Sequence, residues 1–507
     1  MQSRTYHAKK NMITGFLNRV IILGLPFVIR TIVIRKLGAE YLGLGSLYSS
    51  ILQVLNMAEL GFSSAVVFSL YKPMAENNTE EICALLAFYR KVYKIIGIII
   101  LFCGGIITPF LPCLIKGTYP VDINIYILYW IYLINTAISY LGFAYRNVIF
   151  SASQRQDILN NISSAVSIIK FTIQIIVLII FRNYYLYIIW NVIFTLIENT
   201  IVALLTKKYH PDYICKGELK KEKKLGITKQ IKGLAVGQLC KVTRNSFDSI
   251  VLSLYCGLID VAIYSNYYYV FNAVMGILSI VIQSINAGIG NSVSTESKEK
   301  NYKDFQKFYF YFSIIGSICT VCFYNLYQPF MKLWVGESLM ASKTTMILFC
   351  AYFYVVQMGL IRSAYANATG IWWECRKYEI VEMIANLSLN FLLGRLWGMN
   401  GILIATIVTV FVCSIIGLTE VLHNTYFKKS TSKYIYSSCG YFAITIIAIG
   451  ISSVVCQVFD FNGFIRLLVN GAISIVISGL LWIIYGLLWP NGRLYYRELT
   501  NKYLGWK

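Results

Sequence analysis

Charged residues inside otherwise apolar segments are the residues of this sequence best suited to chemistry. The stretch KVTRNSFD (241–248) places Lys241, Arg244 and Asp248 in a run rich in Leu, Val, Ile, Ala and Gly. A charge at the centre of a bilayer costs about 2.5–3.5 kcal/mol, so such side chains are expected to pair or to face a wet cavity. On a helix, Lys241 and Asp248 share a face and Arg244 neighbours Lys241. Cavity lining and ion pairing between helices both remain open.

The first apolar segment carries the same kind of signal. Arg19 and Arg30 are eleven residues apart, which is about three helical turns, so they point the same way about 16 Å apart. Pro26 between them predicts a kink. Glu59, in the next apolar segment, is expected either to form a salt bridge with Arg19 or Arg30, or to titrate or bind a cation.

The intramembrane charges are biased toward cations, which suits an anionic ligand, because Arg binds phosphate oxygens bidentately. Two roles follow from this bias. Glu59 and Asp248 are the candidates for ion coupling or charge pairing. The candidates for binding an anionic headgroup in a cavity are Arg19, Arg30, Lys241, Arg244 and Arg362.

No catalytic residue, metal site or cofactor is predicted. The thirteen cysteines are scattered, and His7, His210 and His423 lie far apart at span ends or in loops. An active site needs a nucleophile beside a base, and no such pair is visible. A membrane-embedded polymerase or acyltransferase is therefore the least favoured of the function classes considered.

The elements that must position these charges are membrane-spanning helices. Of 507 residues, 57% are hydrophobic and 13% charged, and the mean hydropathy is +0.62. Several uncharged runs exceed the roughly 20 residues that a spanning helix needs. Hydropathy predicts an all-α polytopic protein with about 14 transmembrane helices. Lys and Arg favour the segments on one side by about four to one, so both termini are expected in the cytoplasm. That bias also accounts for the net charge of +22 without nucleic acid.

The sequence divides into two similar halves. The stretch LGAEYLGLGSLYSS (37–50) resembles CGLIDVAIYSNYYY (256–269), and KIIGIII (94–100) resembles SIIGSIC (313–319). RNVIFSAS (146–153) resembles RSAYANAT (362–369). The offset drifts slowly, from 220 where Glu40 matches Asp260 to 216 where Arg146 matches Arg362. An even number of helices per half gives parallel repeats related by an axis along the membrane normal.

These patterns predict five regions. The linker between the halves holds nine lysines over 207–232 and is expected to be a solvated connector or, alternatively, a docking site for a cytoplasmic enzyme. The expected regions are a six-helix bundle (1–206), a basic cytoplasmic linker (207–230), a second six-helix bundle (231–427), helices 13 and 14 (434–489) and a cytoplasmic tail (490–507).

The chain resembles the bacterial flippases of lipid-linked polysaccharide repeat units, which serve O-antigen, capsule and teichoic-acid-type export. They share a superfamily with multidrug and toxin extruders and lipid II flippases. The resemblance is carried by RTIVIRKLGAEYLGLGSLYSSILQVLNMAELGFSSAVVFSLYKPMAE (30–76), by RNVIFSASQRQDILNNI (146–162) and by the spacing of Asp248 and Tyr264. It extends over the whole chain in length, span count and repeat layout.

The resemblance implies two six-helix bundles in a V around a central cavity, plus two extra helices that form a groove for a lipid tail. It implies export of an undecaprenyl-pyrophosphate-linked oligosaccharide across the inner membrane by alternating access. The implied partners are that substrate, membrane lipids, H⁺ or Na⁺ as the coupling ion, a polysaccharide polymerase and glycosyltransferases. A multidrug antiporter of the same superfamily is the alternative, although extruders typically have twelve helices and acidic cavities.

Overall fold

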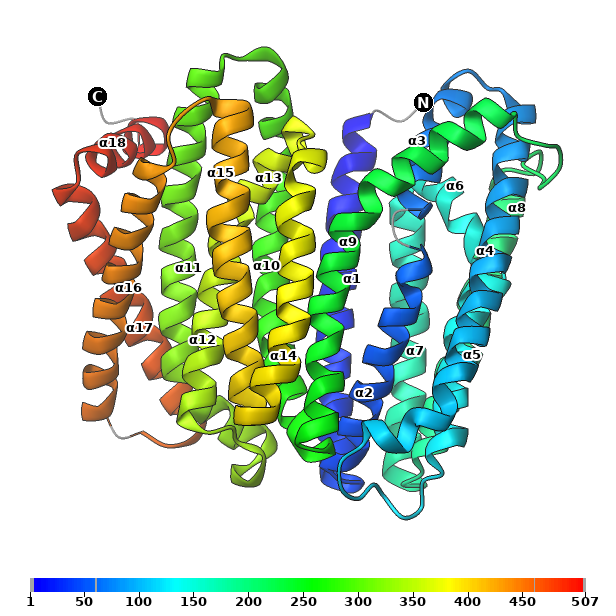
Figure 1. Cartoon of the computed structure of the whole chain (residues 1–507), viewed down its shortest axis with the longest axis horizontal. Coiled ribbons are helices and arrows are strands. Elements are labelled where there is room, and N and C mark those ends of the chain that lie inside the picture. Colours follow the sequence, from blue (N-terminus) through cyan, green and yellow to red (C-terminus); the bar gives the residue numbers. More distant parts are fainter. Residues whose placement is uncertain (1–3, 60–61, 460, 505–507) are drawn as a thin grey trace. The chain divides into compact units, whose positions relative to one another are not determined.

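The protein is built from helices. The computed structural model describes residues 4–59, 62–459 and 461–504, and every regular element in these ranges is a helix (Figure 1). The predicted all-α membrane class is therefore confirmed. The helices group into two compact units, Met1–Ala262 and Ile263–Lys507.

The first unit contains one long helix at each end and several interrupted helices between them. Its elements are α1 (Arg4–Lys36), α2 (Ala39–Leu55), η1 (Asn56–Glu59), α3 (Phe62–Ala75), α4 (Thr79–Ile107), η2 (Thr108–Leu114), α5 (Ile125–Leu141), η3 (Ala144–Arg146), α6 (Asn147–Ala152), α7 (Gln156–Ile180), α8 (Tyr184–Tyr209) and α9 (Lys221–Tyr255).

The second unit begins within the first turns of α10 and ends with a short helix across the bundle end (Figure 1). Its elements are α10 (Leu258–Thr295), α11 (Lys298–Val335), η4 (Glu337–Leu339), α12 (Lys343–Met358), α13 (Leu360–Thr369), α14 (Trp372–Thr409), η5 (Val410–Gly417), α15 (Leu418–Leu422), η6 (His423–Phe427), α16 (Ser432–Val458), α17 (Gly463–Leu488) and α18 (Pro490–Leu504).

The membrane spans agree with the number predicted from hydropathy. Ten helices of the described residues are long and apolar enough to cross a membrane, and the bent pair α5 and α6 makes eleven. The stretch Trp372–Phe427 counts once among the ten but breaks at Gly398, so it holds two of the predicted spans. The interrupted α2–α3 and the charged α9 correspond to the remaining two. Each of the fourteen predicted spans thus has a helical counterpart.

The boundary between the units lies after the basic linker. The helix α9 packs against α2 and α3, so it belongs to the first unit rather than to the half that it begins in sequence. It is helical from Lys221, about ten residues before the predicted span, and an ion pair between Lys223 and Glu81 of α4 ties down its first turn. The finer domain boundaries, and the V-shaped arrangement of the two bundles about a cavity, stay predictions.

Backbone breaks recur at the offset that the repeated sequences predict. Gly38 and Gly257 precede α2 and α10 at an offset of 219, with φ of 127° and 101°. These angles favour glycine, which lacks the Cβ that makes positive φ costly. Helix α6 is followed by Gln154 at φ 61°, and α13 by Gly370 at φ 71°, at an offset of 216. The internal repeat therefore extends to the places where the helices break.

Close helix packing repeats as well. Gly97 of α4 and Gly316 of α11 are both buried at an offset of 219. A Cβ on Gly97 would lie 2.9 Å from Leu141, and one on Gly316 would lie 2.0 Å from Gln357. The two glycines therefore let α5 and α12 approach their neighbours, as small residues do at membrane helix interfaces.

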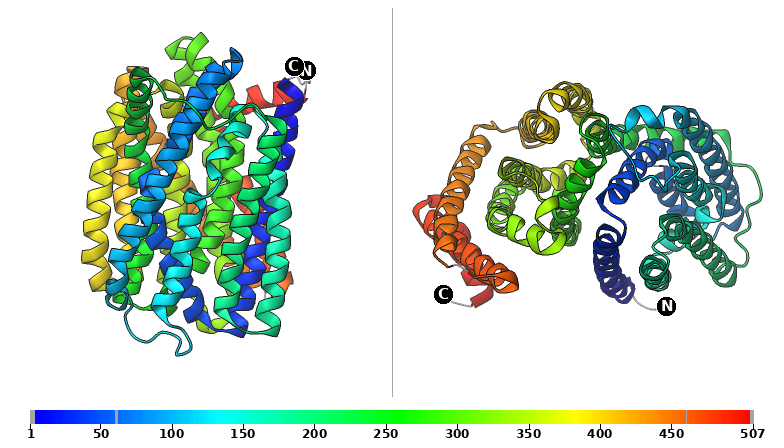
Figure 2. Two further views of the ribbon diagram at one scale, coloured as in Figure 1. Left: turned by 90° about the vertical axis from the view of Figure 1, so that its right-hand side faces the viewer. Right: turned by 90° about the horizontal axis from the view of Figure 1, so that it is seen from below.

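The two final spans pack on α11 through small polar side chains. Asn325 donates to Ser452 of α16 at 2.8 Å and to Ser474 of α17 at 2.9 Å, and Thr445 donates to Ser317 at 2.9 Å. Hydrogen bonds of this kind join helices where lipid gives no hydrophobic driving force. In the end-on view of Figure 2, these spans lie along one side of the second unit.

Candidate functional site

The first helix presents its two arginines differently. Asn18 donates to Ser164 of α7 at 3.0 Å, so this side of α1 faces a neighbouring helix. Arg19, one residue on, is exposed, whereas Arg30 is half-buried and interacts electrostatically with Tyr184 and Tyr187 of α8. Arg19 lies on an exposed surface together with the apolar side chains of Leu17 and Val20.

Glu59 lies at an interruption of the second span. The α-helix α2 ends at Leu55, and the 3₁₀ turn η1 carries the carboxylate. Tyr140 of α5 donates its hydroxyl to Oε2 of Glu59 at 2.9 Å, and Tyr93 of α4 donates to Oε1. In the described part of the chain these two tyrosines, and no arginine, hold the carboxylate. Non-helical backbone at membrane depth is tolerated where it is enclosed by protein or lines a cavity, as at this turn.

The polar stretch of α9 lies beside that turn. Ser246 donates to Gln53 of α2 at 2.9 Å, and the Thr243 hydroxyl lies 3.9 Å from the sulfur of Met57, two residues before Glu59. The neighbouring Arg244 is half-buried. The first unit therefore brings the KVTRNSFD segment and the Glu59 turn together.

Asp248 and Lys241 belong to the same KVTRNSFD segment. Asp248 is 1% exposed, so it lies in the protein interior and not on an open surface. Lys241 lies on α9, but its side chain is outside the described residues. The predicted pairing within the segment stays a prediction.

Arg362 belongs to the second unit and is enclosed by protein. It is 5% exposed and donates from Nη2 to Ser414 of η5 at 2.9 Å. Its repeat counterpart Arg146, at an offset of 216, donates from Nη1 to the carbonyl of Ala203 in α8 at 3.0 Å. Arg146 and Arg362 each join an interrupted helix to the last helix of their bundle. The two halves therefore share this structural contact.

Sequence reasoning missed the tyrosines that hold Glu59. Tyr93 and Tyr140 sit in apolar runs, and nothing in their spacing distinguishes them from core aromatics.

Lys170 of α7 and Glu198 of α8 are weaker candidates from the sequence, because placement at span ends explains both charges. The structure places them within electrostatic range of each other, so each compensates the charge of the other.

Comparison with known proteins identifies the fold. No protein-family model matches the chain, and no curated protein matches it. The solved structure of the lipid II flippase MurJ in an inward closed conformation aligns with a TM-score of 0.65 at 16% identity, covering 97% of this chain and 99% of that one.

Multidrug transporters of the MATE family align less completely. An inward-facing MATE transporter of the MOP superfamily gives a TM-score of 0.61 at 13% identity, covering 83% of this chain and 99% of that one. The bent form of the MATE transporter VcmN from Vibrio cholerae gives 0.52 at 15% identity, with 84% and 99% covered. The chain is thus a multi-pass membrane protein with the fold that MATE transporters share with the lipid II flippase MurJ.

Proposed function

We propose that the chain is a flippase that moves an undecaprenyl-pyrophosphate-linked oligosaccharide from the inner to the outer leaflet by alternating access. The observation that carries the proposal is the extent of the structural match. The MurJ structure covers 97% of the chain, whereas the MATE structures leave about one sixth of it unmatched. That difference is about the length of α16 to α18, which extends a twelve-helix transporter to fourteen spans.

The charge of the candidate site supports an anionic cargo. Arg19 is exposed, and Arg30 and Arg244 are half-buried, so all three are accessible enough to meet a ligand. Arginine binds phosphate oxygens through paired N–H donors, and these positions are proposed to bind the pyrophosphate together with Lys241. Arg362 is enclosed and bonded to Ser414, which favours a role in joining helices.

Glu59 is the proposed residue for coupling transport to H⁺ or Na⁺. Its carboxylate lies at a helix interruption inside a membrane span, the kind of place where transporters bind ions. Two tyrosine hydroxyls donate to its two oxygens, which fixes the position of the carboxylate. Asp248, buried on the adjoining α9, is proposed as the second carboxylate for ion coupling or for charge pairing, with Lys241 or Arg244 as its cationic partner.

The proposed location is the inner membrane with both termini in the cytoplasm, on the strength of the asymmetric Lys and Arg distribution. A reporter that is active only in the periplasm, fused after Lys224, should give no signal. Activity of that fusion would reverse the proposed topology.

The proposed function is tested by asking whether the protein transports an anionic or a cationic cargo. In a strain that depends on the protein for surface polysaccharide, Arg19→Ala with Arg244→Ala should abolish surface display while the amount of protein in the membrane stays constant. Display that persists while efflux of a cationic dye is lost would favour a multidrug antiporter, which the TM-score of 0.61 to a MATE transporter keeps as the second candidate.

A further inference from the structure

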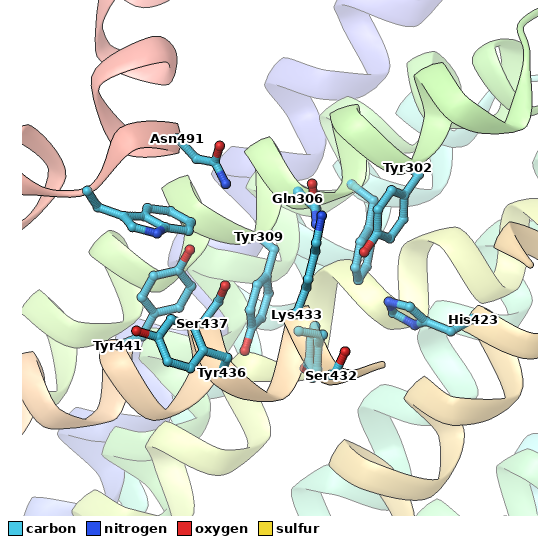
Figure 3. Close-up of a pocket in the computed structure, with 13 residues that line it drawn as sticks. Tyr302, Gln306, Tyr309, His423, Ser432, Lys433, Tyr436, Ser437, Tyr441 and Asn491 are labelled. Atoms are coloured by element: carbon cyan, nitrogen blue, oxygen red, sulfur yellow. The ribbon is translucent and has the colours of Figure 1, made fainter. Parts of the chain in front are cut away.

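The second unit contains a pocket that the transport proposal does not use. It encloses about 330 Å³ between the first turns of α11, the turn η6, the first turns of α16 and the junction of α17 with α18. Figure 3 shows Gln306, His423, Ser437 and Asn491 around it. A second hollow of about 240 Å³ adjoins it and shares Tyr302, Ser432 and Lys433 with its lining, so the two form one pocket with a mouth.

The mouth of this pocket is basic. It is lined by Lys303, Lys429 and Lys433 against a single acid, Glu299. All three lysines are exposed, and no acidic side chain of the described residues forms an ion pair with any of them. Neighbouring lysines do have partners, as Lys300 pairs with Glu296 at 2.6 Å. The mouth therefore offers an excess of positive charge to an anion.

The interior contains polar atoms that have no partner among the described residues. His423 is fully buried, and its Nδ1 donates to the Thr419 carbonyl at 2.9 Å. A carbonyl only accepts, so Nδ1 carries the hydrogen and Nε2 of the neutral ring is an acceptor. This Nε2 is buried without a hydrogen bond. The hydroxyl of Tyr434, which is 5% exposed, lies near the Tyr309 hydroxyl, but it too lacks a partner at hydrogen-bond distance and angle. Native proteins rarely leave such groups unsatisfied.

The unsatisfied atoms define the ligand. His423 Nε2 needs a donor such as a hydroxyl, Tyr434 can donate to an oxygen, and the lysines attract a phosphate. The pocket lies at the ends of membrane-spanning helices, where Tyr436 and Trp489 contribute the aromatic rings typical of a membrane interface. Beyond the mouth, α16 exposes apolar side chains that suit acyl chains, namely Ile435, Phe442 and Ile446.

We propose that this pocket binds the headgroup of an anionic phospholipid whose phosphate carries a hydroxylated alcohol, as in phosphatidylglycerol. The phosphate lies at Lys303 and Lys433, and the glycerol hydroxyls reach His423 and Tyr434. The bound lipid links α11, α16 and α18, which close the pocket. The site is separate from the arginines proposed for transport, all of which lie in other elements.

The test uses the purified full-length protein, with lipid retention measured by native mass spectrometry during titration. Each lysine near a phosphate contributes about five-fold in affinity. The variant Lys303→Ala with Lys433→Ala should therefore bind phosphatidylglycerol about twenty-five-fold more weakly. The control Lys298→Ala with Lys300→Ala removes the same number of charges from the first turn of α11, outside the pocket, and should change binding less than about two-fold. Equal losses of affinity in both variants would mean that the lysines act only through the general positive charge of this surface. That result would overturn the proposed site.

A second variant tests the interior without disturbing the fold. Tyr434→Phe removes one hydroxyl and should weaken binding about five-fold, whereas Tyr426→Phe, on η6 but outside the lining, should not. Phosphatidylethanolamine should bind more weakly than phosphatidylglycerol, and glycerol 3-phosphate alone should not compete at equal concentration. Full competition by glycerol 3-phosphate would identify a soluble phosphate ester as the ligand and contradict the lipid assignment.

Discussion

The hydrogen bonds to Glu59 give the sharpest energetic prediction. Tyr93 and Tyr140 each donate to one carboxylate oxygen within the first unit. A hydrogen bond to a charged group contributes about 1.5–3 kcal/mol, and a neutral one about 1 kcal/mol. Tyr140→Phe should therefore lower the free energy of unfolding by about 2 kcal/mol. The same change in a Glu59→Gln background should cost about 1 kcal/mol, because the acceptor is then uncharged.

The measurement is a double-mutant cycle in mixed micelles, where unfolding by denaturant is followed for the four proteins. The coupling energy between Tyr140 and Glu59 should be about 1 kcal/mol, and the same cycle with Tyr129, which donates to the Gly104 carbonyl instead, should give less than about 0.3 kcal/mol. Equal coupling for both tyrosines would mean that the carboxylate is not held as described.

Three further predictions concern packing, helix joining and pH. Gly316→Ala should destabilise the protein by about 1–3 kcal/mol through overlap with Gln357, whereas Gly450→Ala, with open space around it, should be neutral in the same thermal-unfolding assay. Arg362→Lys should preserve protein abundance better than Arg362→Ala in membrane immunoblots, because lysine can still reach Ser414. Burial and the nearby Arg155 lower the pKa of His210, so the unfolded chain binds more protons there. The free energy of unfolding should therefore fall as the pH drops through the ordinary pKa of histidine, and His210→Gln should weaken that dependence.

Each of these has a result that would count against it. Equal melting temperatures for the Gly316 and Gly450 variants would mean that α11 and α12 are not in close contact. Equal abundance of the Arg362→Lys and Arg362→Ala proteins would show that no cation is needed there. A pH dependence unchanged in His210→Gln would place the titrating group elsewhere.

The internal repeat could be predicted from the sequence because short stretches of the two halves resemble each other. Gly97 and Gly316 stand at matching places in two similar apolar stretches, KIIGIII and SIIGSIC. In the structure both glycines are sites of close helix packing. Breaks such as Gln154 and Gly370 share an offset but not a residue type, since either residue can adopt the left-handed conformation. The repeat therefore appears more clearly in backbone angles than in identities.

The environment of the charges could not be predicted in the same way. Spacing along α1 places Arg19 and Arg30 on one side, but only the neighbouring helices decide that one is exposed and the other lies near tyrosines. Likewise, His423 lies at a span end, and the sequence around it gives no sign of a binding site. Its role as a pocket wall arises from contacts among α11, η6 and α16, which no single segment encodes.

The proposed function assigns transport of a lipid-linked anionic glycan to the cationic positions of α1 and α9. The most direct measurement is the movement of an undecaprenyl-pyrophosphate-linked saccharide between leaflets of proteoliposomes that contain the purified protein, read by access of an added glycosidase. The unmodified protein should transfer the saccharide, and Arg30→Ala with Arg244→Ala should transfer it at least about ten-fold more slowly, through loss of about 1.4 kcal/mol. Transfer at an unchanged rate in that variant, or no transfer by the unmodified protein alongside transport of a cationic drug, would contradict the proposed function.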